Sequence, residues 1–327
     1  MISCQTTIER WTLIEPFEIA REVILEQPVL MITLTDEQGR IGRAEAAGVD
    51  YDGETPESMA EQIAEIMPLF QDGIRGENLL KMLGAGGARN ALDCALWDLR
   101  AKQSGIPAWQ TAGIIGLKPV TTAFTIGLGD EATTRRKARE ARSFPLLKLK
   151  VDASRHIDIV RMVQEEHPDA RVIVDANQSW SLSLLKSLLP QLALAGVELV
   201  EQPLAQGSDA LLDNFQSPIP LAADESCTDR ASLAALRGRY QFINIKLDKC
   251  GGLTEGLALL KEARKQGFGL MVGNMCGTSL AMAPAFLLAQ SCSYVDLDGP
   301  LLQTMDRAVP MVYRQGVVQP PNTALWG

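Results

Sequence analysis

Three carboxylates stand at the ends of three consecutive apolar runs in the second half of the chain. Asp175 ends VIVD, Glu201 ends ELVE, and Asp224 follows LAA. On neighbouring strands these acids would offer hard oxygen ligands, which Mg²⁺ prefers while it keeps positions for water and a substrate oxygen. Any one of them alone would be read as the cap of a following helix. Three in succession predict a magnesium site.

Lysines end the apolar runs on both sides of these acids. Lys148 and Lys150 lie two residues apart in LLKLK and share one face of a strand, and Lys246 follows FINI. We expect Lys148 and Lys150 to lower each other's pKa, so that Lys148 tunes Lys150 and a neutral amine is accessible near neutral pH. A KxK pair alone would indicate solvated lysines. With Lys246 facing Lys150 across the metal, the pattern predicts two bases that remove and return a proton on opposite faces of a carbon.

The last apolar run ends in a pair of aspartates, Asp296 and Asp298, which share one face by the same alternation. An inward pair of unpaired acids is costly unless a cation lies between them, and a substrate ammonium group would serve. The following Gly-Pro indicates a turn, which explains Asp298 but leaves Asp296 unexplained. The pair therefore predicts a binding site for an amino group.

The elements that must position these side chains repeat regularly after residue 115. Eight short apolar or β-branched runs alternate with loops and helical stretches, and from the second run onward their polar ends lie 22 to 28 residues apart. Each interval fits one βα unit. Eight successive units predict an α/β fold with a TIM-type (β/α)7β barrel over residues 116–309 and a site at the carboxyl ends of its strands.

The first 115 residues show a different pattern of strands and helices. Strand patterns at residues 6–11, 29–34 and 41–46 precede helical patterns between residues 55 and 105, which predicts an α+β capping domain over residues 1–115. The tail, residues 310–327, shows little periodicity, and we expect it to pack on this capping domain.

Composition excludes several classes of partner. Lys and Arg total 31 against 40 Asp and Glu, and the net charge of −9 disfavours nucleic acid and anionic membrane surfaces. No apolar run approaches the roughly 18 residues of a membrane span. The six cysteines are scattered without CxxC spacing, and the N-terminus lacks a signal-peptide pattern, so we expect a cytoplasmic protein.

Together these motifs resemble the enolase superfamily, in its muconate-lactonizing-enzyme subgroup. The likeness covers nearly the whole chain and includes the stretches PFEIAR, GARNALD, DAN, EQP, ADES and NIK. The DxD pair is similar to that of dipeptide epimerases, the L-Ala-D/L-Glu epimerases above all. The resemblance implies an isomerase with Mg²⁺ on Asp175, Glu201 and Asp224, acting on a dipeptide at its C-terminal residue by two-base 1,1-proton transfer through an enediolate. The sequence leaves a homo-oligomer open.

One position departs from that pattern. The resemblance implies an arginine shortly after PFEIAR that receives a glutamyl side chain, and Ile24 stands there instead. We expect the C-terminal side chain of the substrate to meet Arg21 and Ile24, and apolar or neutral residues to be accepted at least as well as glutamate, unless Arg21 turns in and restores the acidic preference.

Two alternatives stay open from the sequence. An o-succinylbenzoate synthase or a muconate cycloisomerase would use the same metal and only one lysine as base, and the DxD pair would then have no purpose. A catalytically inactive barrel that binds amino acids would need neither both lysines nor all three acids.

Overall fold

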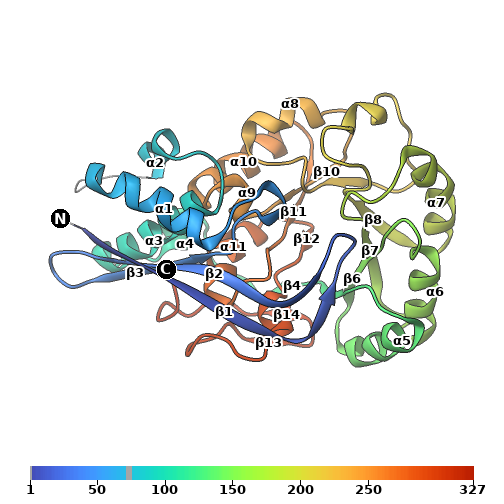
Figure 1. The fold of residues 1–327 in the computed structure, drawn as a ribbon, viewed down its shortest axis with the longest axis horizontal. Coiled ribbons are helices and arrows are strands. Elements are labelled where there is room, and N and C mark those ends of the chain that lie inside the picture. The colour runs from blue at the N-terminus through green and yellow to red at the C-terminus, as the bar shows by residue number, and fades with distance from the viewer. Residues whose placement is uncertain (1, 71–75) are drawn as a thin grey trace.

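An antiparallel sheet begins the chain in the computed structural model, which describes residues 2–70 and 76–327 (Figure 1). Its strands are β1 (Ser3–Glu18), β2 (Val23–Thr35) and β3 (Ile41–Ala46). All three predicted strands are present, and β1 and β2 are longer than expected. Their register shifts between Thr12 and Phe17, and Figure 1 shows the β1–β2 hairpin running from the capping unit to the barrel.

Four helices complete the N-terminal unit: α1 (Pro56–Ile66), α2 (Gly76–Met82), α3 (Gly87–Ser104) and α4 (Ala108–Thr111). Helix α3 packs directly on β2 and β3. Gly42 makes this contact possible, because a Cβ atom there would lie 2.3 Å from the carbonyl oxygen of Ala95. The helix ends where Gly105 takes a φ of 70°, as its sequence predicts.

Eight parallel strands form the second sheet, in the order β12-β11-β10-β9-β8-β7-β6-β5. They are β5 (Phe124–Ile126), β6 (Leu146–Lys150), β7 (Arg171–Asp175), β8 (Val197–Glu201), β9 (Leu221–Ala223), β10 (Phe242–Ile245), β11 (Gly269–Val272) and β12 (Tyr294–Val295). The sheet curls until its edges meet, where the Ala123 N–H donates to the Val295 carbonyl at 2.7 Å. The predicted TIM-type barrel is confirmed.

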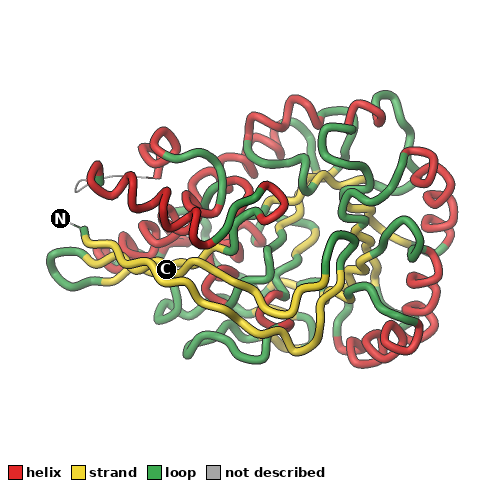
Figure 2. Tube along the Cα trace, in the orientation of Figure 1, coloured by secondary structure: helices red, strands yellow, loops and turns green. Residues whose placement is uncertain are grey.

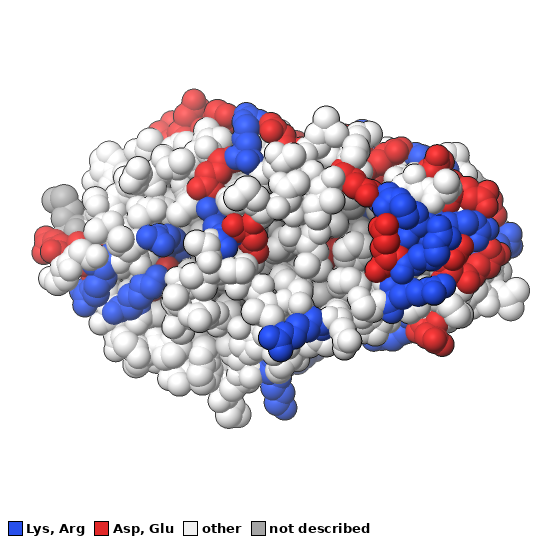
Figure 3. Space-filling model, turned by 90° about the horizontal axis from the view of Figure 1, so that it is seen from below, with Lys and Arg blue, Asp and Glu red and all other residues white. Residues whose placement is uncertain are grey.

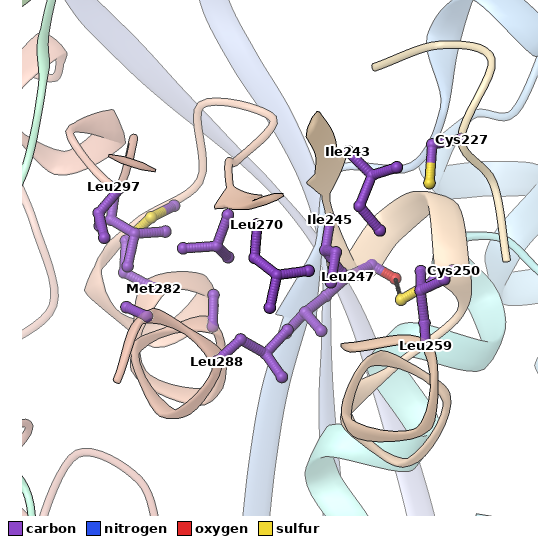
Figure 4. Packing of buried hydrophobic residues seen from close by; sticks show 14 of the residues in the cluster. Cys227, Ile243, Ile245, Leu247, Cys250, Leu259, Leu270, Met282, Leu288 and Leu297 are labelled. Carbon is purple, nitrogen blue, oxygen red and sulfur yellow. Dashed lines mark hydrogen bonds between the residues drawn. The ribbon is translucent and has the colours of Figure 1, made fainter. Parts of the chain in front are cut away.

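Helices follow the strands on the outer side of the curled sheet (Figure 2). They are α5 (Glu131–Glu140), α6 (Ile157–Glu166), α7 (Leu182–Leu194), α8 (Leu233–Leu236), α9 (Leu247–Cys250), α10 (Leu253–Lys265) and α11 (Ser279–Ala289). Outward-facing strand residues pack against them. Figure 4 shows part of this layer, in which Ile245 and Leu270 of the strands belong to one buried cluster with Leu259 and Leu288 of the helices.

Along several strands the inward-facing residues change from apolar to charged. Leu146, Ile173, Leu199 and Met271 belong to one buried cluster that fills the amino-terminal end of the barrel. Two residues further along several strands, the same face carries charged side chains. This alternation places a packed floor beneath the candidate site at the carboxyl ends of the strands.

The C-terminal tail contacts both units. Strands β13 (Tyr313–Arg314) and β14 (Val317–Val318) form a small sheet with β4 (Val120–Thr121), which precedes the barrel. The buried Trp326 then donates its indole N–H to the Cys94 carbonyl in α3 at 3.0 Å. The tail thus joins the start of the barrel to the capping unit.

Charged side chains gather at the end of the molecule that carries α5 and α6, where Figure 3 shows both signs interleaved. Arg135 pairs with Glu131 and Glu165, and Arg136 pairs with Glu140. These are exposed pairs of the kind that contributes about 0–1 kcal/mol each to stability. Within residues 2–70 and 76–327, the helices are too short or too polar to cross a membrane.

Candidate active site

The three strand-end acids meet as the sequence predicted. Asp175, Glu201 and Asp224 are at most 1% exposed, and one carboxylate oxygen from each lies within 4.8 Å of the others. They come from β7, β8 and the end of β9, which are neighbours in the sheet. Parallel strands therefore bring acids that are 23 to 26 residues apart in sequence to one point.

Four lysines surround this triad. Lys148 Nζ lies 3.0 Å from Asp175 Oδ2 and 2.9 Å from Glu201 Oε2. Lys150 Nζ lies 2.7 Å from the same Asp175 oxygen, while on the other side Lys246 Nζ lies 2.7 Å from Asp224 Oδ2. The fourth is a lysine of α9, whose Nζ lies 2.6 Å from Asp224 Oδ1. Lys150 and Lys246 thus flank the triad from opposite sides.

The expectation that Lys148 has a lowered pKa is wrong. Burial alone would lower the pKa of the Lys148 ammonium. The carboxylates of Asp175, Asp296 and Glu201 outweigh burial and raise the pKa well above its ordinary value. The same balance raises the pKa of Lys246, chiefly through Asp224. Sequence reasoning considered the neighbouring lysine and missed the carboxylates that the curled sheet brings closer.

The three acids provide oxygen ligands and buried negative charge, and both fit a divalent cation. Glu201 Oε2 and Asp224 Oδ2 are buried, and their neighbours among the described residues are the ammonium groups of Lys148 and Lys246. Burial and the Asp175 carboxylate raise the pKa of Glu201 to about 8. Asn244 Nδ2 donates to the other Glu201 oxygen at 2.7 Å and fixes its orientation. Three clustered carboxylates, with Glu201 oriented by Asn244, are suited to Mg²⁺.

The two aspartates at the end of β12 are buried but not alike. Asp296 Oδ2 lies 2.9 Å from Lys148 Nζ, so this carboxylate is not unpaired, contrary to the premise from sequence. Asp298 accepts the Thr125 N–H at 2.6 Å. Burial and the neighbouring Asp296 raise the pKa of Asp298 to about 7. Within residues 2–70 and 76–327, Asp298 is therefore the member of the pair that forms no ion pair with a lysine.

A cavity of about 500 Å³ opens above the lysines. Lys150 and Lys246 line its base, and the hairpin tip with the loop after β3 line its sides, including Ile24 and Tyr51. Asp296 and Asp298 are not among its lining residues in the described chain. The acidic loop at residues 50–54 forms part of the cavity wall.

Arg21 faces the cavity but is already held by the barrel. Its Nη1 donates to Glu225 Oε1 at 2.9 Å, and its guanidinium carbon lies 4.8 Å from the centre of the Tyr51 ring. Ile24 packs near the buried Phe17 on the same hairpin. The side of the cavity that faces the cap thus combines apolar surface with an arginine whose charge is balanced.

Residues 274–276 form another wall of the cavity, and the segment 303–307 is hydrogen-bonded to this wall. Gln303 Nε2 donates to the Cys276 carbonyl at 2.6 Å, and the Thr304 N–H donates to the Thr12 carbonyl of β1 at 2.9 Å. Arg307 Nε lies 3.0 Å from Glu45 Oε2 in β3. One segment therefore contacts the cavity wall, the hairpin and the capping sheet.

Sequence reasoning assigned no role to several site residues. Lys249 lies three residues after Lys246, on the first turn after β10. Glu225 directly follows Asp224, and Asn177 lies two residues after Asp175. Asn177 Oδ1 accepts from Lys150 Nζ at 3.0 Å. Their signal was available, because polar residues just beyond strand ends lie at the active-site face of a barrel.

Two family descriptions match the chain. Residues 1–113 match the mandelate racemase / muconate lactonizing enzyme N-terminal domain, and residues 130–324 match the enolase C-terminal domain-like family. The two matches together cover nearly the whole sequence.

Two curated relatives are similar over most of their length. The chain is 44% identical over 302 residues to an L-Ala-D/L-Glu epimerase of Escherichia coli, covering 91% of this chain and 93% of that one. It is 43% identical over 278 residues to an N-acetyl-D-glutamate racemase of a Pseudoalteromonas species, covering 83% and 87%.

Solved structures share the fold. An enolase family member from Agrobacterium tumefaciens with homology to dipeptide epimerases, solved with bound sodium and L-Ala-L-Glu, superposes with a TM-score of 0.97 at 40% identity over 100% of both chains. A dipeptide epimerase from Methylococcus capsulatus, complexed with Mg and L-Arg-D-Lys, gives 0.90 at 30% identity and covers 97% and 96%.

Proposed function

The chain belongs to the mandelate racemase / muconate lactonizing enzyme family, and from this premise we propose that it is a Mg²⁺-dependent isomerase that epimerises dipeptides at their C-terminal residue. The observation that carries the proposal is the placement of Lys150 and Lys246 on opposite sides of the acid triad, each 2.7 Å from a different carboxylate. A carbon between the two lysines presents one face to each.

The two lysines divide the proton transfers. The amine of one removes the α-proton from one face, and the ammonium of the other delivers a proton to the opposite face, which inverts the configuration. In the reverse reaction the lysines exchange roles. When bound by Asp175, Glu201 and Asp224, Mg²⁺ supplies Lewis-acid stabilisation of the negative charge that develops on the substrate carboxylate.

Asp298 and Asp296 are proposed to bind the free ammonium group of the dipeptide. The raised pKa of Asp298, about 7, reflects a buried carboxyl group without a cationic partner, which a substrate ammonium would provide. For the C-terminal side chain, Ile24 and Phe17 offer apolar surface and Arg21 is engaged by Glu225. These contacts support acceptance of apolar or neutral residues at least as well as glutamate.

A second candidate is racemisation of N-acyl amino acids on the same lysines. The ion pair between Lys148 and Asp296 favours it, because it satisfies one of the two acids without any substrate cation. The similar protein from Pseudoalteromonas is named for such a reaction.

Proton exchange in D₂O tests the proposal. The enzyme with Mg²⁺ is incubated with L-Ala-L-Leu, L-Ala-L-Glu and their N-acetyl forms, and products are followed by ¹H NMR and chiral chromatography. We expect deuterium at the C-terminal α-carbon together with the L,D epimer. Formation of an alkene from a cycloisomerase or synthase substrate, or absence of exchange in every dipeptide, would contradict the proposal. Turnover of the N-acetyl forms alone would establish the second candidate.

A further inference from the structure

Tyr51 carries a hydroxyl group that is buried at the cavity and has no hydrogen-bond partner among the described residues. Nine side-chain polar atoms in the described chain are buried without a hydrogen-bond partner, and those that belong to cavity-lining residues are Tyr51 OH and Glu225 Oε2. A buried donor without a partner costs about 1–3 kcal/mol. Such a cost is retained where a ligand completes the hydrogen bond.

The ring of Tyr51 is held in place by its neighbours. Tyr51 belongs to the 3₁₀ helix Asp50–Asp52 in the loop after β3. The Arg21 guanidinium lies over its ring at 4.8 Å, and Arg21 is itself bonded to Glu225 Oε1 at 2.9 Å. Contacts from the hairpin and from the barrel thus fix where the hydroxyl points.

The Tyr51 side chain lines the same cavity as the two lysines proposed to move the proton. Burial, followed by the charges of Asp224 and Glu225, raises the pKa of Tyr51, so the hydroxyl keeps its proton and can donate a hydrogen bond. Lys150 and Lys246 line the same cavity. With the reacting carbon between these lysines, the carboxylate bonded to that carbon lies on the triad side.

We propose that Tyr51 is a catalytic residue whose hydroxyl donates a hydrogen bond to a carboxylate oxygen of the substrate. The inference rests on the proposed function, in which this carboxylate is the group that all substrates share. Negative charge moves onto the carboxylate oxygens as the α-proton leaves. A donor fixed beforehand therefore stabilises the transition state more than the ground state.

The variant Tyr51→Phe isolates the hydroxyl, because the ring that Arg21 covers remains. We expect kcat to fall about 10²–10³-fold, the range for a lost oxyanion donor, for L-Ala-L-Leu, L-Ala-L-Glu and L-Ala-L-Lys alike, with KM changed much less. With α-deuterated substrate, the isotope effect on kcat should persist or increase, because proton abstraction is the step that slows.

Tyr294→Phe is the matched control. Its hydroxyl donates to Glu198 Oε2 at 3.1 Å near the amino-terminal end of the barrel, far along the strands from the cavity, and its loss should leave kcat unchanged. A Tyr51→Phe enzyme with kcat within twofold of wild type, or a loss confined to one side chain or to KM, would overturn the assignment. If the wild type exchanges the α-proton of no dipeptide, the proposed function fails first and this assignment falls with it.

Discussion

Replacing the two flanking lysines one at a time should separate proton exchange from epimerisation. In Lys150→Ala or Lys246→Ala, one face of the reacting carbon has no acid or base, so inversion cannot be completed. The remaining lysine can still remove and return a proton on its own face. Each variant should therefore exchange the α-proton of one substrate epimer without changing its configuration, and the two variants should prefer opposite epimers.

The structure indicates that both variants keep the metal site. Asp175 retains the Lys148 ammonium at 3.0 Å when Lys150 is removed, and Asp224 retains Lys249 at 2.6 Å when Lys246 is removed. No metal ligand is left without a lysine partner. The expected loss is thus that of proton transfer alone, about 10²–10⁴-fold, which corresponds to about 2.7–5.4 kcal/mol in the activation barrier.

The assay follows both epimers of one dipeptide in D₂O, with ¹H NMR for exchange and chiral chromatography for inversion. Lys186→Ala, an exposed lysine of α7, serves as the control and should behave as wild type. Epimerase activity within tenfold of wild type in either active-site variant would refute the two-base reasoning. Exchange of both epimers at equal rates by one variant would also refute it, because a single lysine would then reach both faces.

Further outcomes follow from the acids and the cap. Asp224→Asn should weaken Mg²⁺ binding by more than about 10-fold and abolish both activity and the Mg²⁺-dependent rise in Tm; full activity in chelator-treated buffer would exclude the metal role. N-acetyl-L-Ala-L-Leu should lose about 3–5 kcal/mol in kcat/KM relative to the free dipeptide, and equal turnover would remove the assignment of Asp296 and Asp298. Because the ammonium needs the charged form of Asp298, the KM of free dipeptides should fall as pH rises through about 7, a dependence absent from Asp298→Asn. Among L-Ala-L-Leu, L-Ala-L-Glu and L-Ala-L-Lys, kcat/KM for the glutamate dipeptide should not dominate, and Ile24→Arg should shift the preference toward it; a strong wild-type preference for glutamate would show that Arg21 releases Glu225 to bind substrate.

The barrel and the composition of the triad were predictable because local signals determine them. Every second residue of a strand lies on the same face, so Ile173 with Asp175 and Leu199 with Glu201 show an apolar floor and an acidic rim from the sequence alone. The 22- to 28-residue intervals then identify the βα units and place the rim residues at one end.

Contacts between distant parts of the chain were not predictable in this way. Lys148 reaches Asp296 across 148 residues of sequence, and Arg21 reaches Glu225 across 204. The first pairing depends on how far the sheet curls, and the second on how the hairpin bends after the register shift in β1. Alternation and spacing contain neither quantity, so the sequence predicted an unpaired Asp296 and an unpaired Arg21 where the structure has ion pairs.

The segment 303–307 has a consequence for how parts of such enzymes can be exchanged. It bonds to Thr12 in β1, to Glu45 in β3 and to Cys276 on the cavity wall, although it lies far from the first two in sequence. A hybrid that inherits residues 1–113 from one parent and the remainder from another would separate these partners. We therefore expect hybrid proteins to fold most often when residues 303–307 come from the same parent as the N-terminal unit. In such exchanges this segment belongs with the capping unit.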